Sequence, residues 1–242
     1  MGLYGKIIDL QKLGSAWDHV RKNKPACGVD NVSYEDFENR KKEELKQLNL
    51  ELAEHRYESL PVKLIDLYKG EKVRKIALFC MRDKVVQQSL ANDLGKIYEP
   101  LFPPCSYAYR PGQSALQALN LIENRIKQGG TLWVLKMDIA NFFDNIDHGI
   151  LLKELSGRIS EHDVLDLLKD ILEAKILDEK TGELEKNHKG VFQGASCAPI
   201  FSNIYLLDYD REMKNRCGFY VRYSDDILVL EKAEENARET YN

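Results

Sequence analysis

The sequence has 242 residues and lacks any uninterrupted apolar run of the length, about eighteen residues, that a membrane-spanning helix needs. Its first residues, MGLYGKIIDLQK, are too polar for a secretory signal peptide. The five cysteines are scattered, odd in number and without a CxxC pair, which disfavours a disulfide framework and a zinc site. The five histidines show no spacing typical of metal ligands. These absences predict a cytoplasmic protein with no membrane partner and with buried or idle thiols.

Charge is distributed unevenly along the chain, although the net charge is only −4. Residues 1–130 carry 21 Lys and Arg against 17 Asp and Glu, a net +4, whereas residues 131–242 carry 14 against 22, a net −8. A basic half suits phosphates and an acidic half suits cations, although an uneven solvated surface explains the difference about as well. With 43% hydrophobic residues, the chain can bury the core of one large domain or of two interleaved subdomains.

Helical periodicity and cap residues recur along the chain, without an internal repeat or a low-complexity linker. We expect helices that begin at Ser33, at Asp83 (to about Tyr98), at Ser114 (to Lys127), at Ser160 and at about Pro199. Their predicted inward-facing residues are Phe37, Leu45, Leu48 and Leu52; Val86, Leu90 and Leu94; and Ile200, Ile204 and Leu207. Ser33 with Asp36 resembles a capping box, and Ser160 with Asp163 is expected to cap the fourth helix. The segment DEKTGELEKNHKG has the turn residues of a hairpin or loop.

The stretch FYVRYSDDILVL, residues 219–230, places the adjacent acids Asp225 and Asp226 between two apolar arms. Burying two carboxylates requires hydrogen bonds, a cation or a raised pKa. An ordinary hairpin with its turn at Ser224-Asp225 is the simpler interpretation, because Asp is a good turn residue. A metal site would need a third acid from a second strand.

The segment TLWVLKMD predicts such a strand, with an acid at its end. Leu132, Val134, Lys136 and Asp138 share one face, and Trp133, Leu135 and Met137 share the other. Three acids that converge repel one another unless divalent cations lie among them, about 3.5–4 Å apart in two-metal sites. From these residues alone, the turn and the metal site are equally good interpretations.

Six motifs in a fixed order resemble those of reverse transcriptases. LKMDIANFFDNIDH, GVFQGASCAPIFSNIYL and YVRYSDDILVL resemble the palm motifs. Upstream, GVDNVSYEDFE, VRKIALFCMRDKVVQQSL and SYAYRPGQSALQAL resemble the N-terminal and fingers motifs of the prokaryotic, group II intron-like branch. The resemblance runs from about Gly28 to Leu230 and is far more specific than a YxDD sequence alone.

The resemblance implies an α+β fold: a right-hand polymerase palm, made of an antiparallel sheet backed by helices, with helical and β fingers. It implies fingers over residues 1–112 and 150–192, and palm over residues 113–149 and over residues 193–242 with the YSDD hairpin. The sequence ends 16 residues after Asp226, where relatives continue into a thumb. We therefore expect the thumb to be absent, and supplied either by the missing C-terminal part of a longer protein or by another chain.

The implied activity is RNA-directed DNA polymerisation, in which deoxynucleoside triphosphates extend a DNA or RNA primer on an RNA template. Asp138 matches the first metal-binding Asp of the family, Asp225 matches the second, and Asp226 is the adjacent acid. They would hold two Mg²⁺ ions, for which Mn²⁺ could substitute. One ion would activate the primer 3′-hydroxyl, and the other would hold the triphosphate and stabilise the leaving pyrophosphate.

Other residues match the family's substrate contacts. They are Arg74 for the triphosphate, Lys69 or Lys72 for a second cation, Phe143 as the gate against a 2′-hydroxyl, Ile139, Gln193 and Gly194 beside the nucleotide, and Arg110 for template or fingers backbone. Without the resemblance, Phe142 and Phe143 read as core aromatics and each lysine as solvated surface. The sequence departs from its relatives at Ala198, where Ser is usual, and at Ala108-Tyr109, where Gly-Phe is commoner.

A second function remains open: a maturase-like RNA-binding scaffold that assists intron splicing with little synthesis of its own. The presence of Asp138, Asp225 and Asp226 favours the enzyme, since a decayed scaffold could lose its acids. The biological setting stays open among intron mobility, CRISPR spacer acquisition from RNA and phage defence.

Overall fold

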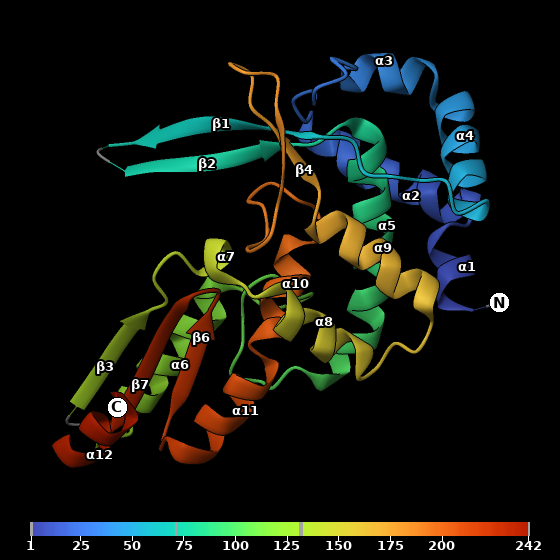
Figure 1. The fold of residues 1–242 in the computed structure, drawn as a ribbon. Helices are drawn as coiled ribbons and strands as arrows, with labels where there is room; N and C mark the ends of the chain where they lie inside the picture. The colour runs from blue at the N-terminus through green and yellow to red at the C-terminus, as the bar shows by residue number, and fades with distance from the viewer. Residues whose placement is uncertain (1, 71, 131–132, 242) are drawn as a thin grey trace. The chain divides into compact units, whose positions relative to one another are not determined.

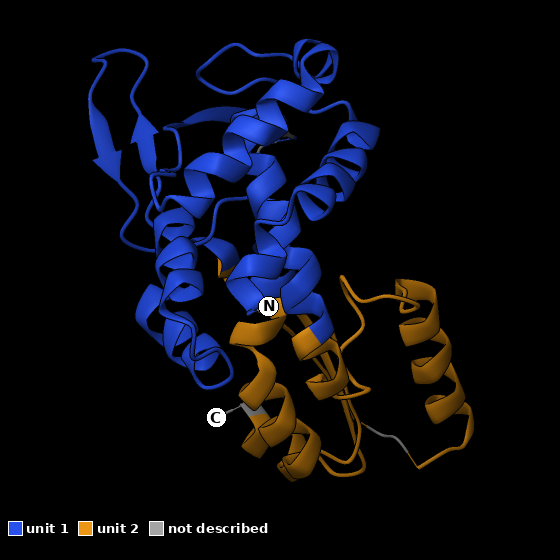
Figure 2. Ribbon diagram, turned by 90° about the vertical axis from the view of Figure 1, so that its right-hand side faces the viewer, with its two compact units in different colours: residues 1–96, 143–201 blue, residues 97–142, 202–242 orange. Residues whose placement is uncertain are grey.

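The chain forms two compact units, each assembled from two separate segments of the sequence. The computed structural model describes residues 2–70, 72–130 and 133–241 (Figure 1). Unit 1 comprises residues 1–96 and 143–201, and unit 2 comprises residues 97–142 and 202–242 (Figure 2). Helices and strands occur in both units, which confirms the predicted α+β fold. In the described part of the chain, every helix is too short or too polar to cross a membrane.

Unit 1 is mainly helical. Its helices are α1 (Leu3–Ile7), α2 (Leu10–Val20), η1 (Arg21–Asn23), α3 (Tyr34–Asn39), α4 (Lys41–Ala53), α8 (His148–Ser156) and α9 (His162–Leu172), with most of α5 (Met81–Tyr98) and α7 (Phe142–Asn145) and the first half of α10 (Ala198–Tyr205). Its strands are β1 (Val62–Lys69), β2 (Lys72–Leu78), β4 (Lys175–Leu177) and β5 (Leu184–Lys186).

The predicted helix that begins after Ser33 is two helices, α3 and α4. The capping box is confirmed, because the Ser33 hydroxyl accepts from the Asp36 amide and the Asp36 carboxylate accepts from the Ser33 amide. The prediction of one continuous helix is wrong, since Arg40 leaves the helical conformation at φ −112° and ψ 16°. The apolar face of α4 is nevertheless buried, as predicted. Periodicity therefore identified the buried face but not the break.

The predicted caps of the fourth helix are also wrong. Helix α9 begins at His162, its N-cap is Glu161, and no side chain caps it. The Glu161 carboxylate instead accepts hydrogen bonds from the amides of Leu3 and Tyr4, at 2.5 and 2.9 Å, at the start of α1. These two bonds, with the Tyr4 amide contributing most, lower the pKa of Glu161. The carboxylate thus satisfies the unpaired amides of another helix, a use that local sequence does not reveal.

A four-stranded sheet in the order β2-β1-β4-β5 completes unit 1. Residues 63–69 of β1 pair antiparallel with β2, and the two strands extend as a ribbon from the helices (Figure 1). Strand β4 pairs parallel to β1 and antiparallel to β5. The β4–β5 hairpin lies where the segment DEKTGELEKNHKG predicted a hairpin or loop.

Helix α5 runs through the core of unit 1. Val86, Leu90 and Leu94 are fully buried, as their spacing predicts. Asp83, in the first turn of this helix, is also fully buried. Its carboxylate accepts from the Tyr57 hydroxyl at 2.8 Å and from the Leu60 amide at 3.3 Å. Burial raises the pKa of Asp83 to about 7, although the bond from Tyr57 acts in the opposite direction.

Stability should depend on pH through Asp83. Because its pKa rises from 3.8 to about 7 on folding, the folded chain holds a proton that the unfolded chain has released over this range. The free energy of unfolding should therefore fall as the pH rises from about 4 to about 7, by at most about 1.4 kcal/mol per pH unit from this group. The free energy of unfolding can be measured by urea unfolding at several pH values, for the unsubstituted chain and for Asp83→Asn. It should fall less steeply with rising pH in the variant.

The matched control for this prediction is Asp66→Asn, at an exposed carboxylate on β1. In this variant the free energy of unfolding should fall with rising pH as steeply as in the unsubstituted chain. If Asp83→Asn and the unsubstituted chain lose stability in parallel between about pH 5 and pH 7, Asp83 does not hold a proton in the folded state.

Unit 2 is built on a three-stranded antiparallel sheet in the order β3-β7-β6. Its elements are η2 (Glu99–Leu101), α6 (Ala115–Lys127), β3 (Trp133–Asp138), α11 (Leu207–Arg216), β6 (Tyr220–Tyr223), β7 (Asp226–Glu231) and α12 (Glu234–Tyr241), with the second half of α10. Helix α6 begins at the predicted Ser114 cap, whose hydroxyl accepts from the Gln117 amide at 3.3 Å. The strand and hairpin predicted for this region are confirmed, while Leu132 lies outside the described residues.

The two faces of this sheet carry different residues. On one face Tyr220, Ile227 and Val229 pack with Met213 of α11. On the other face Val221 packs with Ala118 of α6. Strand alternation places Asp138, Asp226 and Tyr223 on this second face, at the end of the sheet where the β6–β7 turn lies. The fold therefore presents acids at the end of the sheet where the β6–β7 turn lies.

Candidate active site

The β6–β7 turn consists of two residues, Ser224 and Asp225, because Tyr223 pairs directly with Asp226. Ser224 has φ +60°, a left-handed conformation that is uncommon for residues other than glycine. A positive φ at the first of two turn residues is the feature of a type II′ hairpin, where Gly is usual. The hairpin prediction is thus confirmed. Ser224 adopts a backbone conformation that is unfavourable for a residue with a side chain.

The register of the sheet aligns the predicted metal ligands. Asp138, the last residue of β3, is the direct partner of Asp226, the first residue of β7. Directly opposed residues of antiparallel strands have side chains on the same face, with Cβ atoms about 4.5–5.5 Å apart. The amide of Ile139 donates to the Asp225 carbonyl oxygen at 3.3 Å, which joins the end of β3 to the turn. All three acids therefore belong to one end of one sheet.

A lysine lies beside these acids. Lys136 Nζ is 3.8 Å from Asp226 Oδ1, and the two side chains are 73% and 60% exposed. An ion pair between exposed groups contributes only about 0.2–1 kcal/mol, so it would not prevent Asp226 from accepting another cation.

The chemistry of the three acids fits Mg²⁺, which prefers carboxylate oxygens. Among residues 2–70, 72–130 and 133–241, however, no three side chains of His, Cys, Asp or Glu form a group that could hold a metal ion. Metal binding by Asp138, Asp225 and Asp226 therefore stays a prediction, supported by strand register and donor chemistry.

Gln193 and Gly194, in unit 1, lie against β2. The Ala77 amide donates to the Gln193 carbonyl oxygen at 2.8 Å. Gly194 has φ +109°, and a Cβ atom there would lie 2.7 Å from the Ala77 carbonyl oxygen. The backbone at Gly194 therefore closely approaches β2 of the same unit. Both the positive φ and the short distance to the Ala77 carbonyl oxygen require glycine at this position.

The predicted triphosphate-binding residues belong to the same ribbon. Arg74 lies on β2 opposite Leu67 of β1, and its side chain is exposed. The backbones of Lys69 and Lys72 pair at the end of the ribbon, but their side chains lie outside the described part of the structure. Arg74 and Ala77, whose amide binds Gln193, belong to the same strand, but strand alternation places them on opposite faces, so triphosphate binding by Arg74 stays a prediction.

The two adjacent phenylalanines differ in environment. Phe142 is 4% exposed, and its ring centroid lies 6.2 Å from that of Tyr205. Phe142 is therefore a core aromatic. Phe143 is half-buried, and its carbonyl oxygen accepts from the Val191 amide at 2.8 Å. Its function as the sugar gate stays a prediction.

Arg110 contacts protein on several sides. Its guanidinium donates to Glu99 Oε1 at 2.8 and 3.0 Å and to the carbonyl oxygens of Pro103 and Ser106 at 2.8 and 2.7 Å. The side chain is 7% exposed, so these bonds are shielded from water. Arg110 therefore holds the backbone of residues 99–106, and a contact with template stays a prediction.

Sequence reasoning missed a buried ion pair next to the turn. Arg222 of β6 and Asp210 of α11 are both fully buried, and Arg222 Nη2 lies 2.6 Å from Asp210 Oδ2. A signal was present, because Arg222 shares a strand face with Tyr220 within an apolar arm. A charge on a core-facing position predicts a buried partner.

Comparisons with known proteins agree on one family. Residues 68–242 match the reverse transcriptase (RNA-dependent DNA polymerase) family. The chain is 30% identical to protein YkfC of Escherichia coli K12 over 193 residues, which are 78% of this chain and 50% of YkfC. It is 30% identical to the group II intron-encoded protein LtrA of Lactococcus lactis over 171 residues, which are 70% of this chain and 28% of LtrA. The chain thus spans half or less of the length of these relatives.

Solved structures share the fold. A chain of a partial Cas6-RT-Cas1–Cas2 complex matches 97% of this chain with a TM-score of 0.60 and 21% identity, over 39% of its own length. Telomerase from Candida albicans, solved with a fragment of telomeric RNA, matches 78% of this chain with a TM-score of 0.55 and 15% identity, over 41% of its own length. The predicted fingers and palm architecture is confirmed by these likenesses.

Proposed function

Because the chain belongs to the reverse transcriptase family, we propose that it carries the polymerising part of an RNA-directed DNA polymerase. It would add deoxynucleotides to the 3′ end of a DNA or RNA primer on an RNA template. The observation that best supports this function is the register of the unit 2 sheet, which sets Asp138 directly opposite Asp226 beside the Ser224-Asp225 turn.

The three acids would hold two divalent ions, Mg²⁺ or, as a substitute, Mn²⁺. When bound, the ions would supply the positive charge that activates a hydroxyl and stabilises a leaving pyrophosphate. Asp138 contributes from the end of β3 and Asp226 from the start of β7, so strand pairing fixes the backbone at both residues. Asp225 contributes from the turn, where its carbonyl oxygen is bound by the Ile139 amide.

Other residues would bind the incoming nucleotide. Arg74 provides a planar fork of donors that suits phosphate oxygens, and Lys69 or Lys72 would add a second positive charge. The remaining nucleotide contacts in this proposal are Phe143 against the sugar and Ile139, Gln193 and Gly194 beside the base pair. One hydrogen bond supports it, from the Ala77 amide of β2 to the Gln193 carbonyl oxygen, since it holds Gln193 beside the strand that carries Arg74.

The division into fingers and palm follows the same proposal. Residues 1–112 and 150–192 would form the fingers, and residues 113–149 and 193–242 the palm with the YSDD hairpin. Because residues 131–242 have a net charge of −8, we propose that a further protein segment, from the same or another chain, supplies cations to hold the duplex. The reaction would take place in the cytoplasm, where RNA templates and nucleotides are available.

A maturase-like RNA-binding scaffold is the alternative function. LtrA is named as an intron-encoded protein, and the chain is also 32% identical over 114 residues to nuclear intron maturase 2 of Arabidopsis thaliana. A scaffold would bind RNA without needing three acids at the end of a sheet. The presence of all three acids therefore favours the polymerase.

Extension of a labelled DNA primer on an RNA template tests this function. The 242-residue chain, with Mg²⁺ and deoxynucleotides, should give short, template-directed products that become shorter as the salt concentration rises. Affinity for a duplex comes largely from positive side chains on phosphates, and residues 131–242 carry excess negative charge.

The control for this assay is Asp225→Ala, which should abolish addition without abolishing RNA binding. Retention of RNA binding with no addition by the unsubstituted chain, in Mg²⁺ or Mn²⁺, would support the scaffold instead. Long products that resist salt would contradict the expected weak hold on the duplex.

A further inference from the structure

We propose that Arg222 is a positioning residue, which holds the Ser224-Asp225 peptide so that the Asp225 carboxylate points toward its metal. This inference rests on the proposed function, because it gives Asp225 its orientation. It depends on residues of unit 2 alone, and it concerns a side chain that lies beneath the turn and belongs to no predicted substrate contact.

Arg222 uses its whole guanidinium inside the protein. Nε and Nη2 donate to the two carboxylate oxygens of Asp210, at 2.7 and 2.6 Å. Nη2 also donates to the Ser106 hydroxyl at 2.8 Å, and both terminal nitrogens lie 3.2–3.3 Å from Asn203 Oδ1. The remaining bond, from Nη1 to the Ser224 carbonyl oxygen at 2.9 Å, is the one that reaches the turn.

The bond to Ser224 fixes a peptide that precedes a predicted metal ligand. Its carbonyl belongs to the peptide unit between Ser224 and Asp225, so Arg222 sets the orientation of that peptide plane. The next peptide is fixed as well, because the Asp225 carbonyl oxygen accepts from the Ile139 amide at 3.3 Å. Both peptides that flank Asp225 are therefore held, and with them the direction of its Cα–Cβ bond.

The turn needs such support because it is strained. Ser224 is held at φ +60°, a conformation that costs a non-glycine residue energy and persists only where its surroundings impose it. The Ser224 hydroxyl lies 3.3 Å from the Tyr109 hydroxyl, and Tyr109 also has a positive φ, of +60°. A turn with this conformation would relax if the Arg222 bond were lost.

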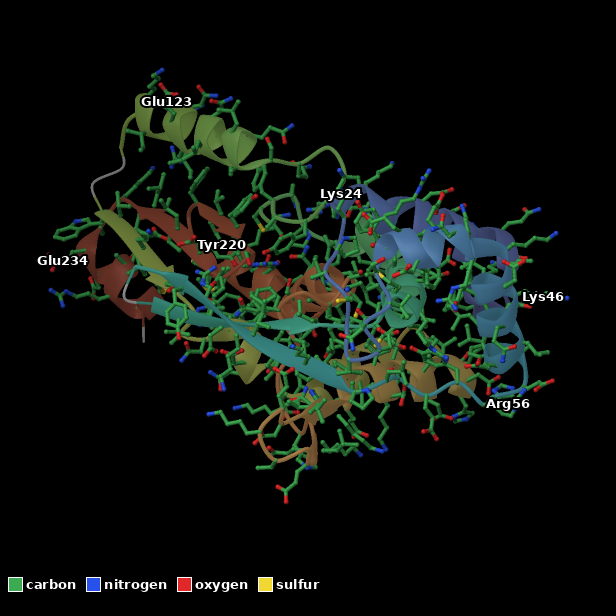
Figure 3. All side chains as sticks on the ribbon, turned by 90° about the horizontal axis from the view of Figure 1, so that it is seen from above. Lys24, Lys46, Arg56, Glu123, Tyr220 and Glu234 are labelled. Atoms are coloured by element: carbon green, nitrogen blue, oxygen red, sulfur yellow. The ribbon has the colours of Figure 1, made fainter. Side chains whose placement is uncertain are left out.

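The pair is more elaborate than packing alone requires. Burying a charged pair costs several kcal/mol per ion, and apolar residues of similar volume often stabilise a fold equally well. Tyr220, labelled in Figure 3, donates to Asp210 Oδ1 at 2.7 Å and so fixes the acid from a second side. The Asn203 amide donates to the Ala108 carbonyl oxygen at 2.9 Å, which fixes Asn203 in turn. Asp210 and Asn203 are therefore each held by a further hydrogen bond. Such bonds are needed if Arg222 positions the backbone, and they are not needed if it only fills the core.

Arg222→Lys tests the proposal, because it keeps the charge but loses the planar fork that contacts Asp210 and Ser224 together. The rate of nucleotide addition should fall by about 10–100-fold, as expected when a catalytic group is displaced by about 1 Å. The KM for deoxynucleotide should change much less. The dissociation constant for Mn²⁺, measured by the electron paramagnetic resonance of free Mn²⁺, should rise severalfold, and hydrogen exchange of residues 219–230 should speed up.

Tyr220→Phe is the matched control, since it removes a hydrogen bond from the same buried pair without touching the turn. It should lower the melting temperature while leaving hydrogen exchange at the turn, Mn²⁺ affinity and the rate nearly unchanged. If Arg222→Lys does not fold, Asn203→Ala replaces it, because it removes the acceptor shared by Nη1 and Nη2 and leaves both charges paired.

The outcomes separate this proposal from the proposed function. A folded Arg222→Lys with unchanged exchange at the turn and unchanged Mn²⁺ affinity overturns the positioning role. Equal effects of Arg222→Lys and Tyr220→Phe on the rate also overturn it, because the pair would then act through stability alone. An unsubstituted chain that binds Mn²⁺ but adds no nucleotide would refute the polymerase, while Mn²⁺ affinity and hydrogen exchange would still decide the role of Arg222.

Discussion

Asp138→Asn is expected to lower the rate of nucleotide addition by about 10³-fold or more, because metal ions contribute several kcal/mol of charge stabilisation in such reactions. Asparagine keeps the size of the side chain and its place opposite Asp226, so strand pairing should survive. What it removes is a full negative charge at the end of β3. Single-nucleotide addition with the primer in excess measures this directly.

Asp208→Asn is the matched control for this substitution. Asp208 belongs to the same unit, lies on α11 with its side chain 67% exposed, and pairs with Arg211 on the same helix. Its replacement should leave both the rate and the Mg²⁺ dependence unchanged. An Asp138→Asn chain that keeps more than about a tenth of the rate would remove Asp138 from the metal site, since the loss would then be below about 1.4 kcal/mol.

Phe143→Ala is expected to raise the use of ribonucleotides relative to deoxynucleotides by about 10–100-fold, because steric exclusion of one small group is worth about 1–3 kcal/mol. A ring beneath the sugar leaves no room for a 2′-hydroxyl, and alanine removes that obstacle. The backbone at residue 143 should persist, since its carbonyl oxygen is held by the Val191 amide. The ratio of kcat/KM for matched ribo- and deoxynucleotides is the measurement.

Phe142→Leu provides the control, because it alters the neighbouring aromatic in the core of unit 2. Loss of a ring that packs at 6.2 Å from Tyr205 should lower the melting temperature but leave the sugar ratio as it was. An unchanged ratio in Phe143→Ala would assign Phe143 to packing. A changed ratio in both variants would indicate a general loosening of α7 rather than a gate.

Local features of the fold were predictable from the sequence. The Ser33 capping box, the buried face of α5, the start of α6 at Ser114 and the hairpin over residues 219–230 depend on contacts between residues a few positions apart. Cap preferences and the periods of helix and strand describe such contacts directly. The family was also evident, because motif order is a property of the chain alone.

Predictions failed where distant segments compete for the same group. The capping pattern at Ser160 and Asp163 is locally reasonable, but Glu161 is the N-cap of α9 and its carboxylate bonds to α1, more than 150 positions away. The break at Arg40 likewise does not interrupt the apolar period of the sequence. Local preferences amount to about 1 kcal/mol or less, so tertiary packing overrides them.

For the candidate site, the sequence by itself determined which acids could bind metal, that two of them lie at a hairpin turn and that the third ends a strand. Only the tertiary structure decided that Asp138 is the direct partner of Asp226, that Gly194 lies against Ala77 and that Arg222 reaches the Ser224 carbonyl from within a buried pair with Asp210. Strand register and buried ion pairs depend on which distant surfaces meet when the core closes, and the period of a single strand carries no information about its partner.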